Sequence, residues 1–78
     1  DEYNHISDKQ DGICAICGNR NKADMALAVD HNHETGFIRG LLCTNCNVAL
    51  GLVHDNVLVL LKMIEYLEKA RDVEDTTD

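Results

Sequence analysis

The spacing of hydrophobic and polar positions changes along this chain, and each change predicts a different element. Larger apolar residues alternate with small ones over 25–29, and a second β-prone run covers 37–42. The polar residues between these runs end in Gly36, and glycine adopts a positive φ without a steric penalty. The segment therefore predicts a β-hairpin, whose strands alternate between a buried and an exposed face.

Three further segments carry the features of helices. Apolar residues recur at three- and four-residue steps after Asn56, a favourable N-cap, which predicts a helix over 55–71. We expect a shorter helix over 44–52 and a weakly specified one in the polar residues 1–11. The acidic and Thr-rich residues 72–78 predict a frayed tail. The last helix has an apolar face wide enough for two neighbours, and we expect it to pack on the core, with the N-terminal segment or a second copy of the chain as the other neighbour.

Length and charge narrow the class of protein. A chain of 78 residues forms one domain at most, and a hydrophobic core of that size rarely contributes more than a few kcal/mol. Fourteen acidic residues against seven basic ones give a formal charge of −7, which argues against binding to nucleic acid or an acidic membrane surface. No apolar run approaches the length of about 20 residues that a membrane span needs, and no signal peptide is recognisable. The first residue is Asp1 rather than Met, which fits a fragment of a longer protein.

Four cysteines form two C-x-x-C pairs on either side of the predicted hairpin. Each pair makes a short turn that presents two sulfurs to one tetrahedral ion, so the spacing predicts a four-thiolate Zn²⁺ site. Its ligands are Cys14, Cys17, Cys43 and Cys46. Two disulfides and a thioredoxin-like redox motif are the alternatives, and the lack of secretory features and of a βαβ context disfavours them. A structural zinc ion would supply the stabilisation that so small a core lacks.

A second group of reactive residues lies at the end of the first strand and the start of the next helix. Asp30 and His31, then His33 in the loop, then Asn47 on the helix have the order of a ββα-metal site. Carboxylate and amide oxygens suit Mg²⁺ or Mn²⁺, and a neutral imidazole can take a proton from water near pH 7. Because side chains alternate along a strand, Asp30 and His31 can act on one phosphate only if the strand ends or bends sharply there.

The residues from Val29 to Asn47, followed by Leu50 and Gly51, resemble the recombination endonuclease VII family of phage HNH nucleases. The run reads VDHNHETGFIRGLLCTNCN, and the likeness extends to the first cysteine turn and to the last helix. The resemblance implies a small α+β fold with a ββα-metal (HNH, His-Me finger) core, a four-cysteine zinc site and flanking helices. It also implies a single HNH endonuclease domain over 1–78, with a helical lead-in at 1–11, the zinc-bound core at 12–53 and the C-terminal helix at 55–71.

Individual roles follow from the resemblance. Asp30 and Asn47 would hold a catalytic Mg²⁺ or Mn²⁺, and His31 would be the general base that activates water for attack on the scissile phosphate. The four cysteines would bind the structural zinc and so position Asn47 against Asp30. His33 is a candidate catalytic residue and phosphate ligand, and the forked donors of Arg39 suit phosphate as well. In many HNH proteins the helical ligand is His rather than Asn, which leaves the metal preference open.

The predicted function is that of a metal-dependent DNA endonuclease, which hydrolyses phosphodiester bonds and nicks or cuts duplex DNA with low sequence specificity. The alternative is a zinc-containing nucleic-acid-binding module without catalysis. The predicted partners are DNA and phage packaging or recombination proteins, with no membrane. We expect a monomer or a homodimer through the C-terminal helix, in the cytoplasm of a bacterial host. Resolution of four-way junctions is not carried over, because in the family it depends on additional helical regions.

The acidic charge is unevenly distributed. Within 12–53 the acidic residues are balanced by equally many basic ones, so the whole of the −7 lies in the flanking segments. Four thiolates around one Zn²⁺ would still leave the zinc site about two charges negative. We therefore predict weak, salt-sensitive DNA binding by this chain alone.

Overall fold

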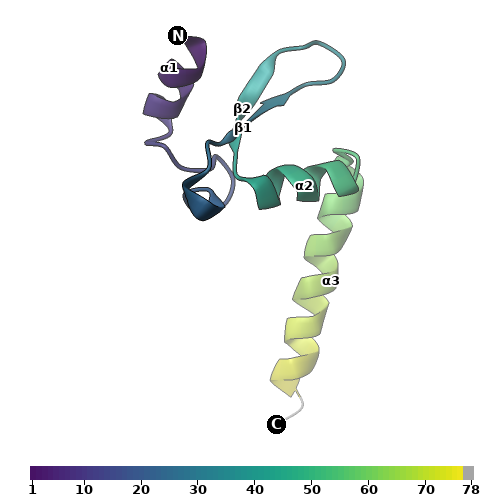
Figure 1. Ribbon diagram of the computed structural model, residues 1–78. Helices are drawn as coiled ribbons and strands as arrows, with labels where there is room; N and C mark the ends of the chain where they lie inside the picture. Colours follow the sequence, from purple (N-terminus) through teal and green to yellow (C-terminus); the bar gives the residue numbers. More distant parts are fainter. Residues whose placement is uncertain (77–78) are drawn as a thin grey trace.

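The computed structural model describes the backbone of residues 1–76 and the side chains of residues 1–71. In chain order its elements are α1 (Glu2–Lys9), a 3-10 turn (Lys22–Asp24), β1 (Ala28–His31), β2 (Ile38–Leu42), α2 (Thr44–Leu52) and α3 (Val57–Thr76). Figure 1 shows α1 and the β-hairpin near one another, α2 crossing beside the base of the hairpin, and α3 extending away as one long helix. The predicted small α+β class is confirmed.

The two strands form the predicted antiparallel hairpin, with Ala28 opposite Leu42 and Val29 opposite Leu41. Pairing begins at Ala28 rather than at Met25, whose side chain is 54% exposed. The reason is the preceding 3-10 turn, which holds residues 22–24 and delays entry into the sheet. In the loop, the side chain of Asn32 accepts hydrogen bonds from the backbone N–H groups of residues 34 and 35, and Gly36 has the expected positive φ of 79°.

The core is small and lies between α1, the hairpin and the start of α2. Its buried side chains are those of Cys14, Leu27, Leu41, Leu42 and Cys43. Gln10 attaches α1 to β2, because its side-chain amide donates to the Leu41 carbonyl at 3.0 Å and accepts from the Leu41 N–H at 3.0 Å. Tyr3 donates its hydroxyl to the Leu27 carbonyl at 2.7 Å. The predicted N-terminal helix is thus tied to the hairpin by polar contacts at both of its ends.

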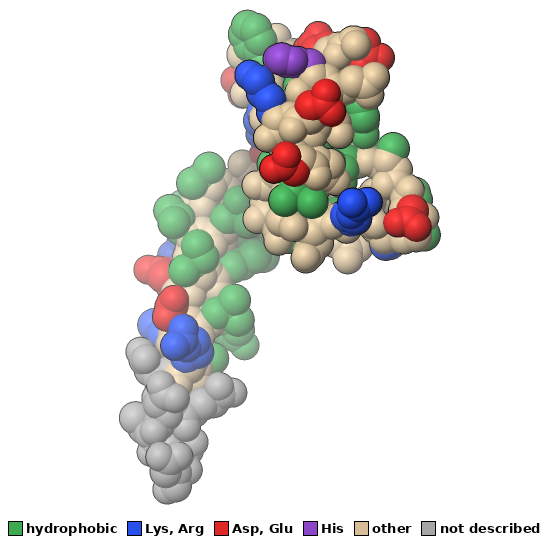
Figure 2. Space-filling model, turned by 90° about the vertical axis from the view of Figure 1, so that its left-hand side faces the viewer, with side chains coloured by type: hydrophobic (Ala, Val, Ile, Leu, Met, Phe, Trp, Pro, Cys, Tyr) green, Lys and Arg blue, Asp and Glu red, His purple; other side chains and the backbone are tan. Residues whose placement is uncertain are grey.

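The C-terminal helix contradicts one expectation from the sequence. Its apolar residues are exposed, with Val57 at 69%, Leu61 at 53% and Leu67 at 62%, so the predicted packing of this face on the core is wrong. Figure 2 shows hydrophobic side chains spread along the projecting helix. The cause is the turn after α2, where His54 and Asp55 both have positive φ and direct α3 away at 105° to α2.

The bounds of α3 also differ from those predicted. Asn56 is the N-cap, since its side chain accepts from the Val59 N–H at 3.1 Å, and the helix then runs from Val57 to Thr76. The sequence predicts a frayed tail over 72–78, but the helix continues through most of it, while residues 77–78 lie outside the described part of the chain. Once a helix has formed, each further residue that joins it gains a hydrogen bond, so α3 can extend into the polar residues that follow.

Within residues 1–76 no single helix is long and apolar enough to span a membrane, although α2 and α3 taken together pass that test of length and composition as a sharply bent pair.

Candidate functional site

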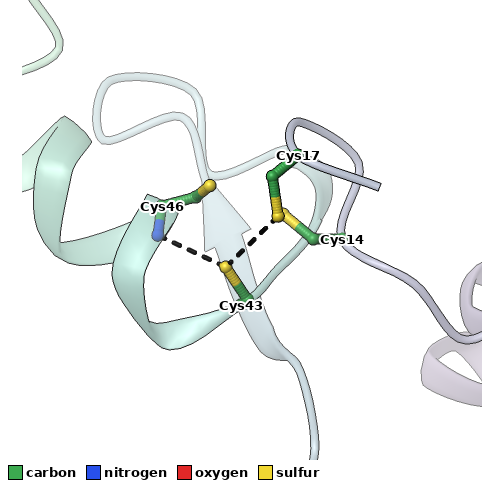
Figure 3. Close-up of side chains that lie close together, drawn as sticks. All are labelled: Cys14, Cys17, Cys43 and Cys46. Carbon is green, nitrogen blue, oxygen red and sulfur yellow. Dashed lines mark hydrogen bonds between the residues drawn. The ribbon is translucent and has the colours of Figure 1, made fainter. Parts of the chain in front are cut away.

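The four cysteines come together at the base of the hairpin. Cys14 and Cys17 lie on the turn that follows α1, Cys43 follows β2 directly, and Cys46 lies in the first turn of α2. Figure 3 shows their sulfurs converging from these two sides. All four Sγ atoms lie within 4.8 Å of one another, and those of Cys17 and Cys43 are 3.7 Å apart. The cysteines are free thiols, so neither of the two alternative disulfides is formed.

This spacing fits a zinc ion. A tetrahedral Zn²⁺ with bonds of about 2.3 Å separates its sulfur ligands by about 3.8 Å, close to the Cys17–Cys43 distance. The backbone N–H groups of Ile16 and Cys46 donate to the sulfurs of Cys14 and Cys43, each at 3.4 Å, and such N–H···S bonds stabilise thiolates. The cysteine cluster predicted from the C-x-x-C spacing is therefore confirmed as a possible zinc site.

The thiols differ in how readily they ionise. Burial opposes ionisation of Cys14, but hydrogen bonds from the backbone of Cys43, Cys17 and Ile16 outweigh it and lower its pKa to about 6. Burial, together with hydrogen bonds to the neighbouring thiols, raises the pKa of Cys46 to about 12. The Cys14 thiol therefore ionises more readily than that of Cys46, which would release its proton as the metal binds.

A buried asparagine that the sequence did not reveal connects the two halves of this cluster. The side chain of Asn21 accepts from the Thr44 N–H at 2.9 Å and donates to the Ala26 carbonyl at 3.0 Å. It is 7% exposed and links the first cysteine turn to the start of α2. No motif in the sequence marks this residue, because its role depends on contacts between distant segments.

The end of the hairpin carries a network of charged side chains. Arg39 donates from Nε to Oδ2 of Asp30 at 2.7 Å and from Nη2 to Oδ1 of Asp30 at 2.9 Å, which is the two-pronged geometry of a strong ion pair. The same Nη2 donates to Oδ2 of Asp55 at 3.2 Å. These contacts raise the pKa of Arg39 above its ordinary value, with the hydrogen bond to Asp30 as the largest cause. The Asp30 side chain is 13% exposed, so this carboxylate is largely shielded from water.

The strand is irregular at Asp30 and His31. Asp30 lies opposite Gly40 but His31 lies opposite Ile38, which leaves Arg39 as an extra residue in β2 and breaks the register. β1 ends at His31, which is exposed. The single-site prediction required that the strand end or bend sharply at this pair; β1 ends at His31, and the extra residue beside it lies in β2.

A cavity of about 360 Å³ opens beside the network. It is lined by Asn32, His33, Glu34, Arg39, His54 and Asp55. Nε2 of His33 lies 3.9 Å from Oδ2 of Asp55, and the His33 side chain is 86% exposed. The sequence pointed to His33 but not to His54. Only the turn that follows α2 brings His54 to the end of the hairpin.

The remaining predicted site residues are less closely connected. Asn47 lies in the first turn of α2 and is exposed, with its backbone N–H bonded to the Cys43 carbonyl at 3.0 Å. Among the described residues, no hydrogen bond joins the side chains of Asn47 or His31 to the charged network. The structure thus brings together Asp30, Arg39, Asp55 and His33. His31 follows Asp30 in the sequence and lies at the end of β1.

Comparison with known proteins adds the family. The family model described as recombination endonuclease VII matches residues 1–69. The chain belongs to the recombination endonuclease VII family. The resemblance inferred from the run around Asp30 is thereby confirmed.

Two phage proteins are similar to this endonuclease VII family chain. The Gene 59 protein of Mycobacterium phage L5 is 47% identical over 68 residues, which is 86% of this chain and 42% of that protein. The Gene 59 protein of Mycobacterium phage D29 is 46% identical over 70 residues, covering 88% of this chain and 42% of its own length. The chain spans less than half the length of the curated relatives it matches.

Proposed function

We propose that this endonuclease VII family chain is a metal-dependent DNA endonuclease domain of the HNH type that hydrolyses phosphodiester bonds. One observation carries the proposal. The carboxylate of Asp30 binds the guanidinium of Arg39, and the exposed imidazole of His31 follows directly in the sequence. The two residues lie where the pairing of β1 with β2 shifts register. Phosphodiester hydrolysis needs a group that binds a cation and a group that acts as a base, and this strand end offers both.

The residues present fit a divalent ion. The guanidinium of Arg39 donates hydrogen bonds to both oxygens of Asp30, so this carboxylate binds positive charge at a position largely shielded from water. Asn47 would add an amide oxygen from α2, a helix whose start carries Cys46 of the cysteine cluster. Carboxylate and amide oxygens are the donors that Mg²⁺ and Mn²⁺ prefer. When bound, such an ion would stabilise the negative charge that develops on the phosphate and on the leaving oxygen.

The histidines and the arginine would act on the reacting groups themselves. His31 is exposed, and its imidazole would take the proton of the attacking water. His33 and Arg39 border the cavity beside the strand end, and both would donate hydrogen bonds to phosphate oxygens. This division of roles leaves proton removal to the strand end and substrate positioning to the loop and β2.

The charge distribution is compatible with DNA as the substrate. The acidic and basic residues within 12–53 balance, and the excess of negative charge lies in residues 1–11 and in the segment after α2. Few basic side chains are available to contact phosphates, and each phosphate contact contributes to the salt dependence of binding. We propose weak, salt-sensitive binding, with affinity increased by other regions of a longer protein, by a second copy or by a partner.

A plasmid-nicking assay tests the catalytic proposal. Supercoiled plasmid is incubated with the zinc-loaded chain and Mg²⁺ or Mn²⁺, with EDTA as the metal-free control, and His31→Ala is compared with His5→Ala. His5 is an exposed histidine on α1, outside the site, so its substitution should leave the rate unchanged. Loss of a general base typically lowers the rate by about 10²- to 10⁴-fold. Nicking that survives His31→Ala unchanged would contradict the assigned base.

The same assay separates the enzyme from a binding module. A chain that binds DNA in a gel-shift experiment but shows no nicking with any divalent metal would favour the zinc-containing module without catalysis. Nicking that depends on Mg²⁺ or Mn²⁺ and on His31 excludes that alternative, since a binding module needs neither.

A further inference from the structure

We propose that Arg39 is an internal competitor for the catalytic metal ion, and that Asp55 is a positioning residue which accepts Arg39 when the ion displaces it from Asp30. This inference rests on the proposed function, because it concerns how the ion gains access to Asp30. The juxtaposition that carries it is one guanidinium bound to two carboxylates from different elements, Asp30 on β1 and Asp55 after α2.

Competition follows from the geometry at Asp30. Arg39 uses two donors, Nε and Nη2, and each takes a different carboxylate oxygen at 2.7 and 2.9 Å. A divalent ion would need at least one of those oxygens and would repel the guanidinium at close range. The Asp30 side chain is only 13% exposed, so the guanidinium and the ion cannot both approach it freely from solvent. Metal binding therefore requires Arg39 to move away.

Asp55 offers Arg39 a second position. Its Oδ2 already accepts from Nη2 at 3.2 Å, so a rotation of the guanidinium can exchange Asp30 for Asp55 without leaving the positive charge unpaired. Nε2 of His33 lies 3.9 Å from the same Oδ2, on the cavity side. Arg39 already lines the cavity, so after the exchange its guanidinium would stay where a substrate phosphate can be bound.

The backbone at Asp55 supports a positioning role. His54 and Asp55 have left-handed conformations, with φ of 54° and 56°, which histidine and aspartate adopt more readily than most other residues with a side chain. The Asp55 N–H donates to the Leu50 carbonyl at 3.0 Å, which holds the turn against the end of α2. This turn brings the carboxylate of Asp55 to Arg39 at the end of the hairpin.

The proposal predicts a specific pattern of metal affinities. The apparent affinity of Asp30 for Mn²⁺ equals its intrinsic affinity multiplied by the fraction of molecules in which Arg39 has left it. Arg39→Gln removes the competitor and should tighten Mn²⁺ binding by about three- to tenfold. Asp55→Asn removes the second position and should weaken Mn²⁺ binding by about threefold or more in the parent. In the Arg39→Gln background, Asp55→Asn should have almost no effect.

The experiment is a Mn²⁺ titration of the zinc-loaded full chain, in which the free ion is counted by its electron paramagnetic resonance signal. Asp24→Asn is the matched control for Asp55→Asn, because Asp24 is exposed and also has a positive φ, of 53°. Arg20→Gln controls for loss of an exposed arginine. Asparagine tolerates the left-handed conformation, so the variant at 55 is expected to fold, and far-UV circular dichroism checks this.

A second readout follows Arg39 directly. In the parent, the ¹H–¹⁵N signal of Arg39 Nε should shift when diamagnetic Mg²⁺ is added, and Asp30→Asn should cause a similar shift without metal. A merely structural role for the arginine would leave that signal unchanged by Mg²⁺. Equal loss of Mn²⁺ affinity from Asp55→Asn with and without Arg39 would show that Asp55 acts on the ion itself, and would overturn the inference.

Failure of the inference can be distinguished from failure of the proposed function. If Asp30→Asn leaves Mn²⁺ binding unchanged, the metal site assigned to Asp30 is wrong and the proposed function fails. If Asp30→Asn abolishes binding but Arg39→Gln does not tighten it, the metal site stands and only the competition by Arg39 is refuted.

Discussion

Replacing one cysteine of the predicted zinc site should abolish cooperative folding of the domain rather than merely lower its free energy of unfolding. The perturbation is Cys43→Ser, at a position that is 6% exposed and whose sulfur is 3.7 Å from that of Cys17. Serine keeps the size of the side chain but is a poor zinc ligand, so the change acts mainly on the metal. The matched control is Ile16→Ser, since Ile16 lies between two of the ligands but is 58% exposed and packs little.

The magnitude follows from how little apolar surface the fold buries. Besides Cys14 and Cys43, the buried side chains of the core are those of Leu27, Leu41 and Leu42, with a few partly buried residues packed against them. Burying one leucine contributes about 1.5 to 3 kcal/mol, so the three together contribute about 5 to 9 kcal/mol. A structural zinc site contributes about 10 to 16 kcal/mol, and whole domains are stable by only about 5 to 15 kcal/mol. Loss of zinc therefore removes more free energy than such a domain has in excess.

The assay is urea unfolding followed by circular dichroism, with the zinc content measured on the same samples. We expect stoichiometric zinc and a cooperative transition for the parent and for Ile16→Ser, and no cooperative transition for Cys43→Ser or for the parent after chelation. A zinc-free Cys43→Ser chain that unfolds cooperatively at nearly the parental midpoint would refute the argument that zinc supplies the missing stability.

Two further predictions concern the contacts around the core and the loop. Gln10→Ala removes both hydrogen bonds to the Leu41 backbone and should lower the free energy of unfolding by about 1 to 3 kcal/mol, measured by urea denaturation, whereas a loss below a few tenths would mean that α1 is not held by this side chain. Gly36→Ala should cost about 1 to 2 kcal/mol because φ is +79°, although a Cβ there would meet nothing within 4 Å. Gly51→Ala on α2, also without a contact, is its control and should be neutral or stabilising in the same denaturation experiment.

Much of the local structure could be predicted from the sequence, because it depends on neighbouring residues. The helix expected over 44–52 coincides with α2, the Asn56 cap begins α3, and Gly36 closes the hairpin loop with positive φ. The cysteine cluster was equally predictable, because two C-x-x-C turns on either side of a hairpin are typical of a site that presents four sulfurs to one zinc ion.

The predictions from the sequence were wrong where contacts between distant segments determine the structure. The apolar pattern of the last helix predicts a packed face, but α3 projects from the domain because two residues other than glycine adopt positive φ in the turn before it. The alternation over 25–29 predicts that the first strand starts at Met25, and the 3-10 turn over Lys22–Asp24 moves its start to Ala28. Propensities of single residues carry no information on either effect, since both depend on how the chain packs around the turn.

The sequence by itself determined the chemistry of this protein: four thiols spaced for zinc, a carboxylate followed by an imidazole, and membership of a nuclease family that the run around Asp30 already indicated. Only the tertiary structure decided how those groups are arranged. The break in register leaves Arg39 as an extra residue whose guanidinium binds Asp30, and the turn after α2 brings Asp55 to the same guanidinium. Both outcomes depend on pairing between strands and on the direction of a turn, which are properties of the folded chain and not of any local pattern of residues.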